Sequence, residues 1–349
     1  MNPFARIGII GEGRMGTSIF HLLLEKGCTI SWICSSQADR GKLEHSFRKR
    51  MGRLKDNGII TLASHENILL NTCITADLSE AGRCDLILET ITEDTGLKKE
   101  LFRSLDQIAR PDAIMASNSS SILPAKMVPS ERRAPLFLGL HFFYPVAMKN
   151  ITEVIVNDRV SKDSVLKTTA FLGSVGRKYI LLDEQSAFIL NRIFLDFQNE
   201  AFLLVNAGKM SCSQLDAIIR EYFFPVGVFE FFDSVGTDLM LTSIKNYTED
   251  YPHRDHFAEL IRHLEEMVGK GHLGKKSNQG FYNYSEGKTI LQETLQPTPD
   301  VDRDEKIEFL RFQYQNAVRR HTVRSGLSLT EMNDALKEYF SIDKGPFEI

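Results

Sequence analysis

The chain has 349 residues, of which 42% are hydrophobic and 25% are charged, and its formal net charge is −4. This length predicts two domains, and the slightly acidic balance argues against binding to nucleic acid or to an anionic membrane. Five cysteines without a CxxC pair favour a reducing cytoplasm over a disulfide framework. No stretch approaches the roughly 20 apolar residues of a membrane span, and a strand predicted from Arg6 leaves no room for a signal peptide.

The first half of the chain alternates short apolar runs with helical patterns. A helix is predicted through Met15 and Leu23, ending at Gly27, and others over 37–57, 94–109 and 161–176. The predicted strands are residues 6–10, 29–33, 85–88, 113–117, 137–142, 153–156 and 179–182. This alternation predicts an α/β, Rossmann-type doubly wound domain over residues 1–183.

The pattern changes near Asp183. Residues 185–267 show helical periodicity throughout, which predicts an all-α domain over residues 184–284 that serves for substrate binding or dimerisation. The remainder, 285–349, is predicted to be a polar linker up to residue 302 and then a truncated second helical repeat, with helices over 303–324 and 328–340.

The evidence for this repeat is a likeness at an offset of 117 residues. The sequence Leu215-Asp-Ala-Ile-Ile-Arg-Glu-Tyr-Phe223 resembles Met332-Asn-Asp-Ala-Leu-Lys-Glu-Tyr-Phe340, and a serine precedes each segment. Amphipathic helices also resemble one another by chance, so both an internal duplication and a coincidence stay open.

A glycine-rich loop, Gly11-Glu-Gly-Arg-Met-Gly16, follows the first predicted strand and opens the first helix. In dinucleotide-binding folds such glycines permit a tight turn, let backbone amides approach the pyrophosphate and let the helix pack on the strand. In this context the motif predicts a cofactor site rather than a simple turn. The candidate cofactor residues here are Gly11, Gly13, Arg14, Met15, Gly16 and Ser35.

The acidic residue that usually ends the second strand of an NAD site is missing. The sequence there reads Cys34-Ser-Ser-Gln37, and the first acid is Asp39, with Arg40 and Lys42 just beyond. Asp39 could turn back to bind the ribose, or the basic residues could hold a 2′-phosphate. We therefore predict NAD as the cofactor, with NADP as the alternative.

A histidine and a glutamate stand twelve residues apart, with an X-Pro turn between them. A strand ending near His141, a turn at Pro145 and a strand entered near Glu153 could bring the two side chains together. Such a pair is a general base with its orienting carboxylate, although a histidine in an apolar strand can also be an ordinary core residue. Together with a dinucleotide loop, the pair predicts oxidation of an alcohol or reduction of a ketone.

Six blocks, in order and at matching spacings over roughly residues 5–285, resemble the short-chain L-3-hydroxyacyl-CoA dehydrogenase family. This family includes 3-hydroxybutyryl-CoA dehydrogenases and also forms the dehydrogenase part of fatty-acid oxidation multienzymes. The blocks are Gly11–Gly16; Asp85-Leu-Ile-Leu-Glu-Thr-Ile-Thr-Glu-Asp94 with Lys98; Ser117-Asn-Ser-Ser-Ser121; His141-Phe-Phe-Tyr-Pro145 to Glu153; Ala187-Phe-Ile-Leu-Asn-Arg192; and Gly274-Lys-Lys-Ser-Asn-Gln-Gly-Phe-Tyr282.

The resemblance implies a role for each matching residue. His141 would be the general base for the 3-hydroxyl proton, and Glu153 would orient it. Ser120 would bind the substrate oxygen close to the nicotinamide, and Asn191 would position the substrate carbonyl. The implied cofactor contacts, besides Ser120, are Glu93, Lys98 and Lys276.

The chain also departs from the family pattern. Tyr144 stands where the family usually has Asn, and Ser186-Ala187 and Gly227-Val228 replace a usual Pro-Gly and Gly-Pro. Tyr144 is therefore a candidate substrate contact. So is Arg50, from a basic helix that could meet coenzyme A phosphates or the phosphopantetheine of a carrier protein, or could simply be solvated.

These observations predict a cytoplasmic enzyme of fatty-acid metabolism that transfers a hydride between NAD(P) and C3 of a 3-hydroxyacyl-CoA. An acyl-carrier-protein thioester is an alternative substrate, and a cofactor-binding relative without activity is an alternative of another class. No metal is expected, because the nine histidines form no HxxxH or HExxH motif. The tail is expected to pack on the first helical repeat, to cover a dimer surface and to carry no chemistry, so both monomer and homodimer stay open.

Overall fold

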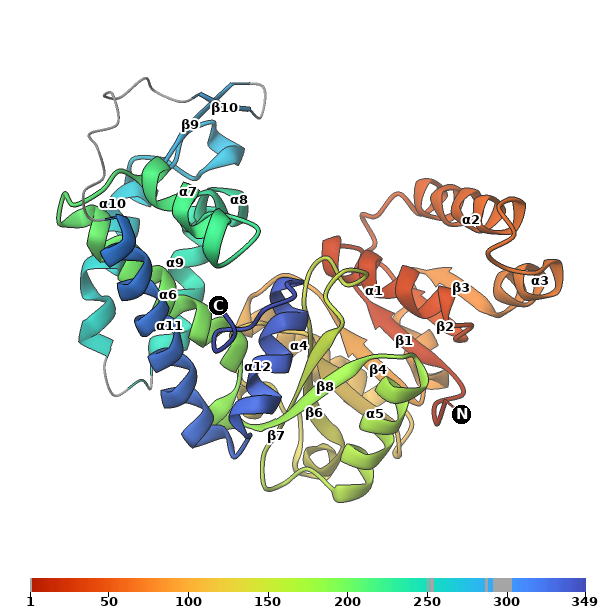
Figure 1. Cartoon of the computed structure of the whole chain (residues 1–349). Coiled ribbons are helices and arrows are strands. Elements are labelled where there is room, and N and C mark those ends of the chain that lie inside the picture. Colours follow the sequence, from red (N-terminus) through yellow and green to blue (C-terminus); the bar gives the residue numbers. More distant parts are fainter. Residues whose placement is uncertain (1, 250, 252–253, 286–287, 291–302) are drawn as a thin grey trace. The chain divides into compact units, whose positions relative to one another are not determined.

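A computed structural model describes residues 2–249, 251, 254–285, 288–290 and 303–349. The chain forms two compact units, Met1–Ala187 and Phe188–Ile349, shown in Figure 1. The boundary predicted after residue 183 lies just before the division between them. None of the described helices combines the length and the apolar composition that a membrane span requires.

The first unit is built on an eight-stranded sheet in the order β3-β2-β1-β4-β5-β6-β7-β8. All neighbouring strands are parallel except β6 and β7, which are antiparallel. The strands are β1 (Ile7–Ile10), β2 (Ile30–Ile33), β3 (Thr72–Thr75), β4 (Leu86–Glu89), β5 (Ile114–Ser117), β6 (Phe137–Phe142), β7 (Ile151–Val156) and β8 (Lys178–Asp183). This arrangement confirms the predicted fold class.

Helices cover both faces of the sheet because its central strands are apolar on both sides. They are α1 (Arg14–Glu25), α2 (Arg40–Asp56), α3 (Leu62–Asn71), α4 (Thr95–Ile108) and α5 (Lys162–Ser174). Short 3₁₀ helices lie in the connections: η1 (Leu78–Arg83), η2 (Pro124–Lys126), η3 (Glu131–Leu136) and η4 (Glu184–Ser186). Helix α2 begins at Arg40 rather than at the predicted Gln37, because the Asp39 carboxylate caps it by accepting from the Lys42 N–H at 3.0 Å.

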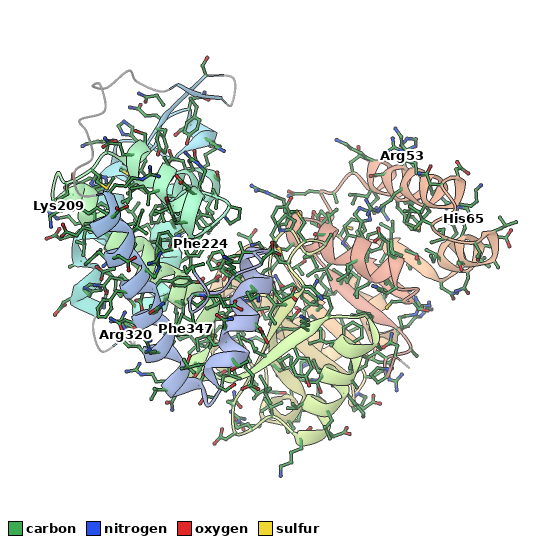
Figure 2. All side chains as sticks on the ribbon, viewed as in Figure 1. Arg53, His65, Lys209, Phe224, Arg320 and Phe347 are labelled. Atoms are coloured by element: carbon green, nitrogen blue, oxygen red, sulfur yellow. The ribbon has the colours of Figure 1, made fainter. Side chains whose placement is uncertain are left out.

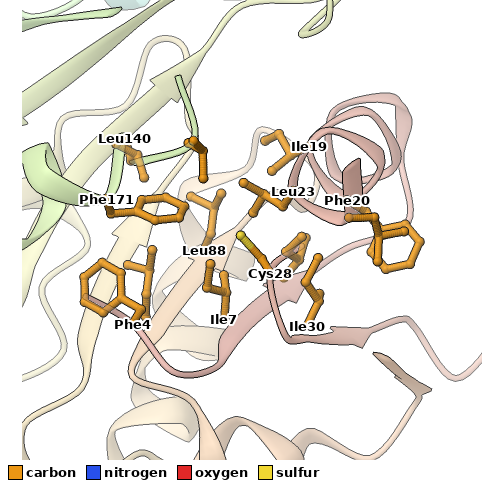
Figure 3. Packing of buried hydrophobic residues seen from close by; sticks show 14 of the residues in the cluster. Phe4, Ile7, Ile19, Phe20, Leu23, Cys28, Ile30, Leu88, Leu140 and Phe171 are labelled. Atoms are coloured by element: carbon orange, nitrogen blue, oxygen red, sulfur yellow. The ribbon is translucent and has the colours of Figure 1, made fainter. Parts of the chain in front are cut away.

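Alternate residues of each strand feed two separate cores. On one face, Ile7, Leu88 and Leu140 pack with Leu23 of α1 and Phe171 of α5, as Figure 3 shows. On the other face, α4 covers a second apolar cluster that includes Ile87, Met115 and Phe102. Because the sheet is fixed on both sides, the loops at its carboxyl edge are held in place.

The second unit is mainly helical, as predicted. Its helices are α6 (Ile189–Asn206), α7 (Cys212–Tyr222), α8 (Val228–Val235), α9 (Thr237–Thr248), α10 (Ala258–Gly269), α11 (Arg303–Ser325) and α12 (Leu329–Phe340), with η5 (Arg254–Phe257) and η6 (Lys275–Ser277). The predicted linker is partly wrong, because strands β9 (Asn283–Ser285) and β10 (Lys288–Ile290) pair antiparallel. Backbone hydrogen bonds hold such a pair without an apolar pattern to signal it. The rest of the linker, 286–287 and 291–302, lies outside the described residues.

The predicted second repeat shares structural detail with the first. Helix α7 begins with a capping box of Ser211 and Gln214, and α12 begins with one of Ser328 and Glu331. Helix α11 packs along α6, so the tail contributes to the core of this unit.

The turns that follow the two helices are also alike. A side chain on Gly227 would collide with Asp216 of α7, and one on Gly345 would collide with Asn333 of α12. Each glycine N–H bonds to a glutamate three residues later, at 3.4 Å after α7 and at 2.7 Å after α12. Two amphipathic helices would not share these details by virtue of their pattern alone, so the structure favours a duplication.

Candidate active site

The glycine loop has the shape that a dinucleotide pyrophosphate needs. A Cβ on Gly16 would lie 2.1 Å from the Gly11 carbonyl oxygen, so only glycine lets α1 approach the loop this closely. A Cβ on Gly13 would meet nothing within 4 Å, and no side chain caps α1 in the first unit. The N–H groups of the first turn of α1 are therefore available to an anion. Arg14 and Met15 begin the helix, with Arg14 exposed and Met15 half-buried.

Glu12 supplies a carboxylate at the end of β2, where the expected acid is missing. Its Oε2 accepts the Ser35 N–H at 2.9 Å, and its Oε1 accepts the Ser35 hydroxyl at 2.5 Å. Burial alone would raise the pKa of Glu12, but the hydrogen bonds from Ser35 outweigh it and lower the pKa. Cys34 is buried, and burial together with the Glu12 charge raises the pKa of its thiol to about 11, so Cys34 stays neutral. This role of Glu12 could not be predicted from the sequence, because nothing in the motif tells where its side chain turns.

Glu93 organises the loop Asn118–Ser121 that follows β5, which we call the serine loop. Its Oε1 accepts hydrogen bonds from the hydroxyls of Ser119 and Ser121 and from the N–H groups of Ser120 and Ser121, at 2.5–3.1 Å. Burial would raise the pKa of Glu93, but the Lys98 ammonium and the serine hydroxyls lower it on balance. Glu93 therefore fixes the backbone that carries Ser120, whose side chain is half-buried.

Lys98 forms a buried ion pair with Glu89, a residue for which no role was predicted from the sequence. The Lys98 Nζ lies 2.6 Å from Glu89 Oε1 and 3.4 Å from Glu93 Oε2, and its side chain is 1% exposed. Glu89 Oε2 also accepts the Ser117 hydroxyl at 2.6 Å. Burial raises the pKa of Glu89, and Lys98 opposes that effect. Lys98 thus connects β4, through Glu89, to the serine loop, through Glu93, and is itself buried.

His141 and Glu153 meet across the antiparallel pair β6–β7. They are direct partners in the strand register, and His141 Nδ1 lies 2.8 Å from Glu153 Oε2. The Glu153 side chain is fully buried and that of His141 is 5% exposed, with the Phe143 ring 4.3 Å from the imidazole centroid to centroid. The Asn118 Oδ1 accepts the Phe142 N–H at 2.9 Å, and this hydrogen bond connects the serine loop to β6. The predicted base and its orienting carboxylate are brought together as expected.

Asn191 lies near the start of α6 in the helical unit, with its amide held at both ends. Its Nδ2 donates to the Tyr247 hydroxyl at 2.8 Å, and its Oδ1 accepts from the Tyr339 hydroxyl at 2.9 Å. Tyr247 comes from α9, and Tyr339 comes from α12 in the tail. Neither tyrosine was singled out from the sequence, because the contact joins residues that lie 56 and 148 positions away from Asn191.

The remaining predicted residues are engaged or exposed. The Lys276 ammonium bonds both oxygens of Asp238 at 2.6 Å within the helical unit, and the Arg50 guanidinium pairs with Glu25 on the first unit. The Tyr144 ring is half-exposed. Their contacts with cofactor or substrate stay predictions.

Comparison with known proteins gives matches over both units. Residues 6–185 match the profile described as 3-hydroxyacyl-CoA dehydrogenase, NAD binding domain, and residues 188–284 match the corresponding C-terminal domain. A probable 3-hydroxybutyryl-CoA dehydrogenase of Deinococcus radiodurans is 30% identical over 80% of this chain and 100% of its own length.

Two solved structures extend the comparison. The (S)-3-hydroxybutyryl-CoA dehydrogenase PaaH1 from Ralstonia eutropha is 27% identical and covers 81% of this chain and 100% of its own, with a TM-score of 0.71. The dehydrogenase part of multifunctional enzyme 1 from C. elegans is 21% identical and covers 96% of this chain and 78% of its own, with a TM-score of 0.60. The latter shows a shared fold over almost the whole chain.

Proposed function

The chain belongs to the 3-hydroxyacyl-CoA dehydrogenase family, and we propose that it transfers a hydride between NAD and C3 of a 3-hydroxyacyl- or 3-oxoacyl-CoA. Family membership confirms the enzyme class and the NAD cofactor predicted from the sequence. The observation that carries the proposal for this chain's own residues is the buried pair of His141 and Glu153.

The pair can move a proton in step with a hydride. Bound NAD would accept the hydride from C3 of the alcohol. His141 Nδ1 faces Glu153, which assigns proton transfer with the 3-hydroxyl to the other ring nitrogen, Nε2. When His141 takes the proton, the Glu153 carboxylate stabilises the imidazolium at 2.8 Å. In the reverse direction the same nitrogen returns the proton to the ketone oxygen.

Two donors outside the pair complete the proposed substrate contacts. The Ser120 hydroxyl, on the loop fixed by Glu93, would donate to the reacting oxygen. Asn191, with its amide held by two tyrosines, would donate to a substrate carbonyl. Polarising both oxygens lowers the cost of charge that develops on them during transfer.

The position of Glu12 supports NAD over NADP. A carboxylate at the end of the second strand accepts hydrogen bonds from the ribose hydroxyls of NAD and repels a 2′-phosphate. The Glu12 carboxylate lies at this position, where it accepts the Ser35 N–H, whereas the Asp39 carboxylate caps α2. We therefore assign ribose recognition to Glu12 rather than to Asp39.

The acyl carrier is proposed from the family and from helix α2. The basic residues of α2 are Arg48, Lys49, Arg50, Arg53 and Lys55, and Arg53 extends outward from this helix in Figure 2. Such side chains would suit the phosphates of coenzyme A, or the phosphopantetheine of a carrier protein as the alternative. A cytoplasmic location and either a monomer or a homodimer remain part of this proposal.

The test is the initial rate of acetoacetyl-coenzyme A reduction with NADH and, separately, with NADPH, followed by loss of nicotinamide absorbance. We expect turnover with NADH, and turnover about 10²–10⁴-fold slower in a His141→Ala variant that still binds NADH. Turnover only with the matched carrier-protein thioester would favour that alternative. NADH binding without turnover of either thioester would favour a relative without catalytic activity.

A further inference from the structure

Two tyrosine hydroxyls hold the Asn191 amide at both ends, with its nitrogen toward Tyr247 and its oxygen toward Tyr339. The amide nitrogen can only donate, so Tyr247 accepts from Nδ2, and the amide oxygen can only accept, so Tyr339 donates to Oδ1. Both tyrosines are 7% exposed, whereas Asn191 is half-buried. Within the described residues, this arrangement uses one of the two Nδ2 hydrogens and leaves the second for a ligand oxygen.

Tyr339 lies outside both matched family domains, the second of which ends at residue 284. Helix α12 is nevertheless firmly packed. The Phe340 ring lies 4.9 Å from that of Phe194 on α6 and 4.1 Å from that of Phe224, which Figure 2 labels inside the helical unit. Helix α11 is anchored on α6 as well, since Arg320 and His321 both bond the buried Asp196 carboxylate, at 2.9 and 3.0 Å.

We propose that Tyr339 is a positioning residue for the reaction: the C-terminal tail holds the Asn191 amide so that one N–H faces the substrate carbonyl. The inference rests on the proposed role of Asn191 in substrate binding. Without a donor on Oδ1, the amide can rotate about its last torsion and can present oxygen instead of nitrogen to the carbonyl. The tail, expected from the sequence to carry no chemistry, thus acts on the reaction through Asn191.

The Tyr339 ring and its hydroxyl have separable roles. The ring packs at 4.5 Å from Phe340 in the aromatic cluster, whereas the hydroxyl reaches Asn191. Tyr339→Phe keeps the ring and removes the hydroxyl that bonds Asn191. Tyr314 on α11 provides a matched control, because it is buried in the same cluster and its hydroxyl has no hydrogen-bond partner in the described structure.

The experiment compares kcat and KM for acetoacetyl-coenzyme A in full-length wild type, Tyr339→Phe and Tyr314→Phe, with and without Asn191→Ala. We expect Tyr339→Phe to lower kcat by about 5- to 30-fold, the effect of losing one orienting hydrogen bond, with KM for NADH unchanged. Tyr314→Phe should keep wild-type kinetics. In the Asn191→Ala background, Tyr339→Phe should have no further effect, because the group through which it acts is gone.

Equal kcat in Tyr339→Phe and wild type would overturn the proposal, as would an equal fold-loss with and without Asn191. A crystal structure of Tyr339→Phe supplies a readout that needs no turnover: the Asn191 amide should lose its single orientation, and an unchanged amide would count against the inference. A wild type that binds NADH but reduces no thioester would therefore contradict the proposed function alone.

Discussion

His141 and Glu153 are cross-strand neighbours whose side chains meet at 2.8 Å between two mainly apolar strands. The antiparallel pairing of β6 and β7 sets this contact, because directly opposed residues on one face have their Cβ atoms about 4.5–5.5 Å apart. A carboxylate that is fully buried needs a partner, and the imidazole is that partner. The same sheet pairing that fixes the fold therefore also fixes the orientation of the proposed base.

Removing the imidazole should abolish most of the activity. We expect His141→Ala to lower kcat by about 10²–10⁴-fold, the usual contribution of a general base. The dissociation constant for NADH, measured by fluorescence titration, should stay close to that of the wild type. Unchanged turnover in a folded variant would exclude His141 as the base.

Replacing the orienting carboxylate by its amide tests the second half of the pair. Glu153→Gln keeps the shape but removes the charge that stabilises the imidazolium, so we expect kcat to fall by about 10- to 10³-fold. Steady-state kinetics with a stability measurement check this. Glu131→Gln, at a carboxylate that is 92% exposed, is the control and should leave kcat unchanged.

Much of the first unit could be predicted because its strands are continuous apolar runs that end at glycine or at polar loops. Strand β3 was missed because Thr72–Thr75 mixes polar with apolar residues and is only half-buried at the sheet edge. Strand β10 was missed for a similar reason, since backbone pairing, which leaves no periodic signal, defines it.

In the candidate site, too, some residues could be predicted from the sequence and others could not. His141 and Glu153 could be paired from the sequence because the hairpin that joins them is local. Glu12 and Tyr339 could not be found, because their proposed roles depend on which way a loop side chain turns and on how a distant helix packs. Tertiary packing, rather than residue pattern, places both.

The preference for NADH over NADPH should depend on Glu12. Glu12→Gln removes the charge that disfavours a 2′-phosphate, so we expect NADH to bind about tenfold more weakly and NADPH more tightly than in wild type. Fluorescence titration with both nucleotides measures this without turnover. Glu66→Gln, at an exposed glutamate of α3, should change neither constant. If the dissociation constants of NADH and NADPH change equally, Glu12 supports the structure of the loop and does not recognise the ribose.

The Lys98–Glu89 pair should matter for stability. Lys98→Met leaves the Glu89 carboxylate buried without its charge partner, which typically costs about 3–5 kcal/mol. Urea unfolding measures the loss, and a Lys98→Met/Glu89→Leu double variant should recover part of it. The control is Lys167→Met, which breaks an exposed pair with Asp163 and should change stability by less than about 1 kcal/mol. An equal effect of the two single variants would contradict the prediction.

Asp216 should make the stability of the protein depend on pH between 4 and 7. Burial raises the pKa of this carboxyl from 3.8 to about 6, even though the Tyr282 hydroxyl and the N–H groups of Phe229 and Glu230 bond to it and oppose the shift. The folded state therefore holds this proton more tightly than the unfolded state does. Its stabilising contribution is fully present below about pH 3.8 and is lost as the pH rises through about 6.

Asp216→Asn keeps an acceptor oxygen at this position and removes the titration. The difference in unfolding free energy between wild type and variant should therefore shift against the wild type, by about 2–3 kcal/mol, as the pH rises from 4 to 7. Urea unfolding of both proteins at several pH values in this range measures that difference. If the two stability curves run parallel from pH 4 to 7, Asp216 does not titrate there, and the hydrogen bonds it accepts outweigh its burial.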